Sequence, residues 1–171
     1  MKFKNRSHAG KELAKRLGSY KRVDAIVYAL PRGGVVVGHE VAIALEVPLD
    51  LIITRKIGHP DNPEYAIAAI CENSDIVFDK KDIQGIDASW FKNEVELQRQ
   101  EAKRRRDVYL SGKRPISCMG EIAIIVDDGT ATGLTIRAAI KEVKHMNPSK
   151  IVIAVPVIPK DVASILRKEV D

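Results

Sequence analysis

Cysteine is scarce in this chain, with two residues among 171. Cys71 and Cys118 form no CxxC pair and have no clustered histidines, so the sequence predicts neither a zinc site nor a redox motif nor a disulfide scaffold. Long apolar runs are missing too: none approaches the roughly 18 uncharged residues of a membrane span, and the N-terminus has no apolar signal segment. We therefore expect a cytoplasmic protein with no membrane partner.

Acidic residues are slightly outnumbered, because 28 Lys and Arg against 23 Asp and Glu give a net charge of +5. A surplus of this size is compatible with nucleic acid and equally with a phosphorylated small molecule. With 45% hydrophobic and 30% charged residues, the composition is that of a globular protein, and the length fits one domain. Composition alone does not identify the ligand.

Apolar runs rich in β-branched residues alternate with segments whose apolar residues recur at helical spacing. The runs predict strands at residues 23–30, 51–54, 75–78, 121–126 and 151–155. We expect helices at residues 7–17, 89–109 and 134–146, from Val162 onward, and after Gly34, where Val37, Val41, Ala44 and Leu45 share a face. Residues 58–65 are dense in turn formers and predict a loop. This alternation predicts a doubly wound, mainly parallel twisted α/β sheet flanked by helices.

The segment after the strand at 121–126 carries the clearest functional signal. Asp127 and Asp128 are followed by Gly129-Thr130-Ala131-Thr132-Gly133-Leu134-Thr135 and then a helix. Such a strand-to-helix turn offers free backbone N–H groups, hydroxyl donors and the positive end of a helix dipole, which suits a phosphate. It is neither a Walker A loop nor a dinucleotide fingerprint. The carboxylates repel a bare phosphate, so we expect them to accept hydrogen bonds from vicinal ribose hydroxyls.

The string from Ile124 to Gly133 closely resembles the phosphoribosyl-pyrophosphate signature of type I phosphoribosyltransferases. Four further strings are similar to one subgroup, the predicted phosphoribosyltransferases of unassigned acceptor, and lie at residues 29–34, 55–58, 62–64 and 154–157. The resemblance covers nearly the whole chain and implies the type I fold. It implies an enzyme of nucleotide metabolism that binds 5-phosphoribosyl 1-pyrophosphate (PRPP), transfers its phosphoribosyl group to a nitrogenous acceptor such as a nucleobase, and releases pyrophosphate.

The resemblance also implies roles for three groups of residues. The acidic pair, Asp127 and Asp128, holds the 2′ and 3′ hydroxyls of the ribose. The turn after it wraps the 5′-phosphate, through Gly129, Thr130, Ala131, Thr132, Gly133 and Thr135. The loop after the first strand binds pyrophosphate with Mg²⁺, through Arg32, Gly33 and Gly34; its glycines let the backbone approach an anion, and the guanidinium offers two donors. We expect the substrate to hold Mg²⁺, which Asp127 or Asp128 contacts through water.

Arg55 and Lys56 are expected to end the second strand and so to border the same crevice. Similar family members use a basic residue there for pyrophosphate. Side chains alternate along a strand, so one of the two faces the site; Lys56 is slightly favoured, and the choice stays open. Residues 59–69 match the family's flexible loop, in which His59, Glu64 and Tyr65 are candidates to touch substrate.

The implied reaction displaces pyrophosphate from the anomeric carbon of the ribose through a transition state with oxocarbenium character. Asp127, Asp128, Arg32 and Lys56 form the expected catalytic set, in which the two basic residues and Mg²⁺ stabilise the leaving group. Hypoxanthine and guanine enzymes of this class have an aspartate three positions beyond the acidic pair, where this chain has Ala131. This departure argues against a 6-oxopurine acceptor.

A second departure concerns the end of the chain. Members of the subgroup usually continue past the last helix with another strand and a segment that helps to cover the acceptor, whereas this sequence stops at Asp171. Either the chain is naturally short or a piece is absent. The expected organisation is therefore one domain over residues 1–171, with a C-terminal segment in question.

An alternative class is a non-catalytic regulator of the same fold that senses PRPP or nucleotides. The basic run Lys103–Arg106 could then supply a footprint for nucleic acid. Acidic residues interleave with this run, so we expect a solvated helix face and no nucleic-acid partner. We interpret Trp90 and Phe91 as core or a dimer contact, and we expect a homodimer.

Overall fold

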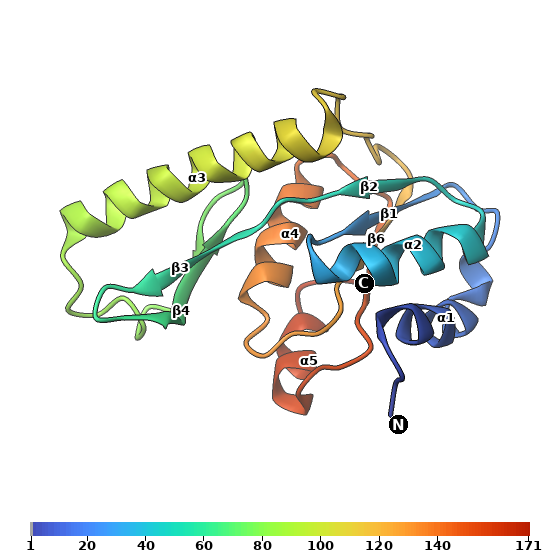
Figure 1. Cartoon of the computed structure of the whole chain (residues 1–171), viewed down its shortest axis with the longest axis horizontal. Helices are drawn as coiled ribbons and strands as arrows, with labels where there is room; N and C mark the ends of the chain where they lie inside the picture. Colours follow the sequence, from blue (N-terminus) through green and yellow to red (C-terminus); the bar gives the residue numbers. More distant parts are fainter. Residues whose placement is uncertain (1) are drawn as a thin grey trace.

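The computed structural model describes residues 2–171, which fold around a parallel sheet of four strands (Figure 1). In spatial order the strands are β2 (Leu49–Leu51), β1 (Ala25–Ala29), β6 (Ile122–Val126) and β7 (Lys150–Ala154). The order reverses between β1 and β6, which pair with Ala29 opposite Val126. Both strands therefore end at the same level, and the loops that follow them emerge side by side.

Two layers of helices cover the sheet, as predicted for a doubly wound fold. On one face, α1 (Arg6–Arg16) and α2 (Gly33–Leu45) pack against Val27, Ile124 and Val126. On the other face, α4 (Leu134–Lys144) and α5 (Lys160–Leu166) pack against Tyr28 and Ile125. Successive side chains of a strand point to opposite faces, so the continuous apolar runs of β1 and β6 fill both cores. A short 3₁₀ turn, Gly18–Tyr20, follows α1.

A smaller antiparallel sheet and one long helix project from this body (Figure 1). The sheet has the order β3 (Arg55–His59), β4 (Asn62–Ile70) and β5 (Val77–Phe78), and the helix is α3 (Ala88–Leu110). Ile57, Ile67 and Ala68 are buried against Trp90 and Phe91 of α3. Trp90 and Phe91 are partly buried against this small core, as the core role predicts, and a role in a dimer contact stays a prediction.

The hairpin corrects the prediction of a loop at residues 58–65. His59 pairs with Asn62, so the turn formers there mark only a tight turn between two strands. The expected flexible loop at residues 59–69 is almost entirely β4. The first half of β4 is exposed and polar, so no alternation of apolar and polar residues indicated a strand there. Its partner β3 lies only a tight turn away in the sequence.

Two further boundaries differ from the predictions. The second strand of the large sheet ends at Leu51, and the buried residues Ile52 and Ile53 lie beyond it; Arg55 therefore begins β3 instead of ending a strand of the parallel sheet. In α2, Ala44 is exposed, whereas the other three residues expected on its buried face are buried. Apart from these corrections, the strands and helices lie within a few residues of their predicted positions.

Candidate active site

A polar cleft of about 400 Å³ opens at the carboxyl ends of β1 and β6. Residues 30–33, 54–56 and 127–132 line it, together with Thr135 and with Arg105 of α3. This is the point at which the strand order reverses, where doubly wound sheets bind their ligands. The fold thus brings three separate segments of the predicted site to one cleft. Of the predicted site residues, Gly34 and Gly133 lie just outside its lining.

Asp127 and Asp128 form an electrostatically strained pair at the end of β6. Asp127 Oδ1 accepts a hydrogen bond from the backbone N–H of Asp128 at 2.8 Å. Burial, reinforced by the neighbouring Asp128 carboxyl, raises the pKa of Asp127 from its ordinary 3.8 to about 7, and the charge of Lys56 counteracts part of this rise. The pair therefore favours a partner that brings positive charge or hydroxyl donors.

Arg6 is a site residue that the sequence interpretation missed. Its Nε lies 2.6 Å from Asp128 Oδ2, so the start of α1 reaches the carboxyl end of β6. The two residues are 122 positions apart, and nothing in the sequence around Arg6 signals a role in binding. The ion pair neutralises one carboxylate of the acidic pair, and it is partly open to solvent.

The glycines after β1 allow α2 to begin directly against the acidic pair. A Cβ added to Gly33 would overlap the carboxylate of Asp128, and one added to Gly34 would come within 3.0 Å of the Cα of Asp127. The sequence interpretation explained both glycines by the approach of an anion. The structure adds a second reason, which is contact with the neighbouring loop. Arg32, next to them, is exposed and lines the cleft.

The turn from residue 129 to 133 is held by its own hydroxyls and by the loop after β7. The backbone N–H of Gly133 donates to Thr130 Oγ1 at 3.0 Å, and the N–H of Thr130 donates to the carbonyl of Val157 at 3.2 Å. Gly133 has a φ of +77° and immediately precedes α4. These hydrogen bonds fix the turn beside the N-terminus of α4 at the cleft, an arrangement that suits an anionic group.

The basic residues on the opposite wall divide into two groups. Lys56 is exposed in the cleft, and its charge acts on Asp127. Arg55 turns toward α3, where its Nε donates to Gln98 Oε1 at 2.8 Å. Burial and the nearby charge of Arg105 lower the pKa of Arg55. Lys56 is therefore the residue that faces the acidic pair, whereas Arg55 and Arg105 form a second cationic edge.

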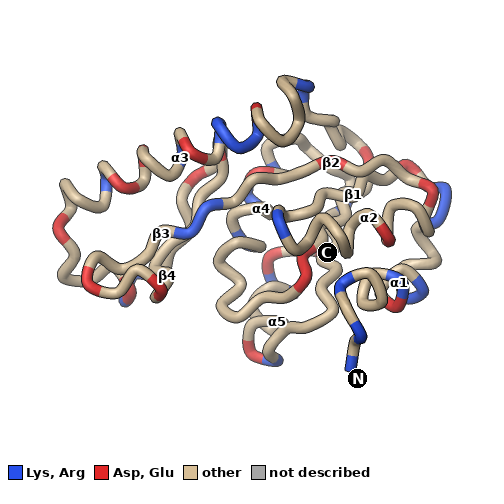
Figure 2. The backbone as a smooth tube through the Cα atoms, viewed as in Figure 1, with Lys and Arg blue, Asp and Glu red and all other residues tan. Residues whose placement is uncertain are grey.

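Arg105 corrects the expectation that the run Lys103–Arg106 is a solvated helix face. Figure 2 shows this run as a basic stretch of α3. Arg104 fits the expectation, with a side chain 63% exposed, but Arg105 is 34% exposed and lines the cleft, and Arg106 is 16% exposed. The reason is tertiary, because α3 packs against β3 and its C-terminal part also reaches β2, where Arg106 donates to the carbonyl of Leu51. The order of charged residues along the sequence did not indicate that Arg105 and Arg106 are partly buried.

The three loop candidates lie on the hairpin and outside the cleft lining. His59 ends β3, and Glu64 and Tyr65 belong to β4. The Tyr65 hydroxyl donates to Oδ1 of Asp82, in the segment between β5 and α3, at 2.8 Å. A role for these residues in contacting substrate stays a prediction.

The residues of the cleft can contact a magnesium ion that is bound mainly by substrate and water, without forming a complete set of protein ligands. Among residues 2–171, no group of three or more His, Cys, Asp or Glu side chains is placed to hold a metal. Mg²⁺ usually keeps several waters and binds through one or two carboxylates plus substrate phosphates. Asp127 and Asp128, beside a turn suited to phosphate, fit that mode of binding.

Among residues 2–171, no helix is long and apolar enough to cross a membrane.

The fold is a doubly wound α/β sheet, and its switch point carries an acidic pair, a glycine- and threonine-rich turn and basic residues, a set that suits an anionic ligand with hydroxyl groups. Comparison with known families makes the assignment specific. The family model described as phosphoribosyl transferase domain matches residues 4–169. The chain belongs to this family, and the resemblance seen in the sequence is confirmed.

Individual relatives agree with the family. A Mycobacterium tuberculosis protein with the provisional name phosphoribosyl transferase is 41% identical over 95% of this chain, which spans 37% of that protein's length. The crystal structure of TT1426 from Thermus thermophilus superposes with a TM-score of 0.80 at 35% identity, over 100% of this chain and 82% of that one. A hypoxanthine-guanine phosphoribosyltransferase of Bacillus anthracis, at 14% identity, a TM-score of 0.50 and coverage of 91% and 77%, shares the fold.

Proposed function

We propose that this protein binds PRPP in the cleft and transfers its phosphoribosyl group to a nitrogenous acceptor, with release of pyrophosphate. The observation that carries the proposal is the convergence in one cleft of the acidic pair, the turn that follows it, Arg32 and Lys56. Each group suits one part of PRPP: carboxylates suit ribose hydroxyls, N–H groups suit the 5′-phosphate, and basic side chains suit pyrophosphate. Family membership supports the same reaction class.

The residues around the acidic pair would orient the ribose. Ionised Asp127 and Asp128 accept hydrogen bonds from the 2′ and 3′ hydroxyls, and Lys56 favours the ionised form of Asp127. Arg6 restrains Asp128 from the side of α1, which lowers the number of positions that this carboxylate can adopt. The anomeric carbon is thereby held at a defined distance from the pyrophosphate contacts, which lowers the entropic part of the barrier.

The leaving group would be stabilised on the other side of the cleft. Arg32 and Lys56 offer charged donors to pyrophosphate, and Gly33 lets the start of α2 approach it closely. Mg²⁺ bound with PRPP would neutralise further negative charge on the pyrophosphate, and Asp127 or Asp128 would contact it through water. Arg105 and Arg55 extend the positive charge along the same wall.

A double variant of the acidic pair tests PRPP binding. In Asp127→Asn/Asp128→Asn the side chains keep their shape and lose their charge, so the fold should persist while Mg²⁺-dependent PRPP binding is lost. The measurement is the thermal stabilisation produced by PRPP with Mg²⁺, and its control is Asp107→Asn, an exposed aspartate on α3. Equal stabilisation of wild type and double variant would refute the assignment of the pair.

Turnover needs a separate assay. Pyrophosphate release is followed with PRPP and Mg²⁺ while purines, pyrimidines and other nitrogen nucleophiles are offered one at a time. We expect one class to be turned over, and Ala131 disfavours the 6-oxopurines. PRPP binding without release for any acceptor would favour the regulator over the enzyme. Assembly as a homodimer and residence in the cytoplasm stay predictions, which light scattering and cell fractionation test.

A further inference from the structure

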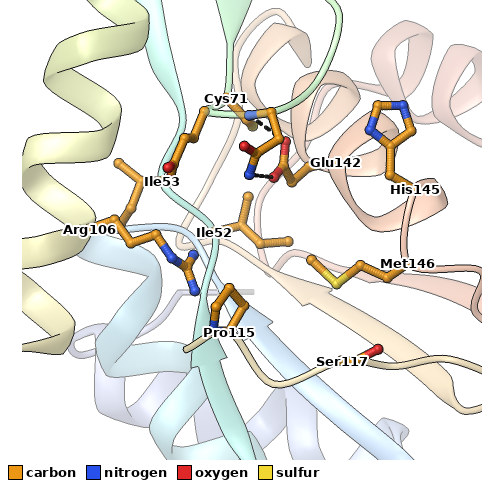
Figure 3. A pocket seen from close by; sticks show the side chains of 11 residues that line it. Ile52, Ile53, Cys71, Arg106, Pro115, Ser117, Glu142, His145 and Met146 are labelled. Carbon is orange, nitrogen blue, oxygen red and sulfur yellow. Dashed lines mark hydrogen bonds between the residues drawn. The ribbon is translucent and has the colours of Figure 1, made fainter. Parts of the chain in front are cut away.

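Three consecutive arginines of α3 have three different surroundings. Arg104 is exposed to solvent. Arg106 faces a separate cavity of about 250 Å³, on whose wall Ile52 and Pro115 also lie (Figure 3). Arg105, between them in the sequence, is partly exposed and lines the cleft proposed to bind PRPP. The groups that hold Arg105 indicate what it does there.

Arg105 keeps much of its positive charge in the cleft, because it shares its carboxylate partner with Arg104. The Nε of Arg105 donates to Glu101 Oε1 at 2.7 Å. Arg104 binds the same carboxylate through two atoms, with its Nε 2.7 Å from Oε2 and its Nη2 3.0 Å from Oε1. One negative charge therefore serves two positive ones, and the guanidinium that lines the cleft is only partly neutralised.

Arg55 brings a second guanidinium to the same part of the cleft. Its Nε donates to Gln98 Oε1 at 2.8 Å, and the side-chain amide of Gln98 donates in turn to Glu94 Oε1 at 2.8 Å. The direct partner of Arg55 is thus a neutral amide. Burial and the nearby charge of Arg105 lower the pKa of Arg55, and the charges of Glu101 and Glu94 offset part of this effect. The two guanidinium groups are therefore close enough to repel each other.

Both guanidinium groups keep Nη donors that a ligand can reach. The protein holds Arg55 and Arg105 through Nε, and within residues 2–171 their Nη groups make no hydrogen bond. These Nη groups are also not buried, since the buried side-chain polar atoms without a partner in this part of the chain are Ser74 Oγ and Arg106 Nη2. Two neighbouring guanidinium groups with accessible donors favour an anion that accepts from both.

The order of the strands indicates which anion this is. Across the sheet lie β6, β1 and β2, and β2 leads directly to the segment that carries Arg55. The proposed function assigns the ribose and its 5′-phosphate to the loop after β6, and pyrophosphate to the loop after β1. A pyrophosphate group that extends away from the ribose then brings its terminal phosphate toward Arg55 and Arg105. A nucleophile attacks the anomeric carbon from the opposite side, so an anionic group on the acceptor would lie away from these arginines.

We propose that Arg105 and Arg55 form a subsite for the terminal phosphate of the pyrophosphate group, so that α3 takes part in substrate recognition. Both arginines donate through Nη to oxygens of this phosphate, while Arg32 and Lys56 serve the phosphate attached to the ribose. The subsite rests on the proposed function and deepens it, because it makes the cleft selective for a sugar 1-pyrophosphate over a sugar 1-phosphate. The resemblance to the family gave Arg105 no role.

Two sugar phosphates that differ only in the terminal phosphate test the subsite. Ribose 1,5-bisphosphate has the ribose, the 5′-phosphate and the proximal phosphate of PRPP, but no terminal phosphate. Calorimetric titration with Mg²⁺ and without an acceptor gives the dissociation constant of each ligand. Arg105→Met should weaken PRPP by roughly tenfold or more, through the loss of charge-assisted hydrogen bonds, and should change the binding of ribose 1,5-bisphosphate by less than about twofold.

Arg104→Met is the matched control, because it removes the same charge from the next residue and from the same partner, Glu101. It should leave both dissociation constants unchanged. Arg55→Met should repeat the selective loss, and it replaces Arg105→Met if that variant fails to fold. Equal weakening of both ligands would indicate a general electrostatic or packing effect and would overturn the subsite, as would unchanged PRPP binding.

Pyrophosphate by itself separates a failure of the subsite from a failure of the proposed function. With Mg²⁺, wild type should bind pyrophosphate more tightly than inorganic phosphate, and Arg105→Met should reduce that preference. If PRPP does not bind to wild type while pyrophosphate shows this pattern, the proposed function fails and the anion subsite stands. If PRPP binds and Arg105→Met weakens neither PRPP nor pyrophosphate, the proposed function stands and the subsite fails.

Discussion

Replacing Asp127 with asparagine should alter how the stability of the free protein depends on pH. Burial and Asp128 raise the pKa of Asp127 from 3.8 to about 7. A carboxyl whose pKa is higher in the folded protein than in the unfolded chain binds more protons when folded, between about pH 4 and pH 7. Its contribution to stability is therefore complete below about pH 4 and is lost as the pH rises through 7.

The size of this contribution follows from the two pKa values. A rise from 3.8 to about 7 corresponds to at most about 4 kcal/mol in the free energy of unfolding, at about 1.36 kcal/mol per pKa unit. The cleft is open to water, which screens the charges, so we expect ~1–2 kcal/mol. The wild-type protein should lose this amount between pH 4 and pH 8, and Asp127→Asn, which cannot ionise, should not.

Urea unfolding at pH 4 and pH 8 measures the effect. The difference in free energy of unfolding between Asp127→Asn and wild type should shift in favour of the variant by ~1–2 kcal/mol on going to pH 8. Asp107→Asn, at an exposed site, corrects for the general pH dependence of the fold. A difference between Asp127→Asn and wild type that is the same at both pH values would refute the raised pKa.

Three further substitutions test the packing that supports the site. Gly33→Ala should abolish PRPP-induced thermal stabilisation, because its Cβ would displace the acidic pair. Gly18→Ala, whose Cβ would have no atom within 4 Å, should leave the stabilisation unchanged. Equal stabilisation of both variants would contradict the close contact between Gly33 and Asp128. Gly133→Ala should lower the free energy of unfolding by about 2 kcal/mol more than Gly120→Ala. Both glycines have a positive φ, but only a Cβ added to Gly133 would meet a side chain, at 2.8 Å. Trp90→Ala should cost about 2–3 kcal/mol in urea unfolding, because the ring joins the hairpin core; no loss would indicate that the ring does not pack there.

The large sheet and the turn after β6 were predictable because their signals are local. The buried strands β1 and β6 read as continuous apolar runs, and the acidic pair and its turn are adjacent in the chain. The alternation of strands and helices predicted a doubly wound sheet, and the end of β6 is where such a sheet binds ligands. The cleft found there is lined by most of the residues predicted for it.

The hairpin was not predictable because its outer half is exposed and polar. β3, a tight turn away, supplies the backbone hydrogen bonds of this outer half of β4. The strand therefore forms there without an apolar pattern in its sequence. Arg55 and Lys56 both line the cleft, but Arg55 also donates to Gln98 of α3, whereas the charge of Lys56 acts on Asp127; the choice between them as the pyrophosphate residue stays a prediction.

What the sequence determined by itself was the chemistry of neighbouring residues: an acidic pair, a glycine- and threonine-rich turn and a basic loop, on strands apolar enough to be buried. The tertiary structure alone decided which distant charges meet them. Arg6 reaches Asp128 across 122 residues, and Arg105 and Arg106, adjacent on one helix, face two different cavities. The physical reason is that side-chain periodicity reports burial along one element, whereas partners depend on how whole elements pack.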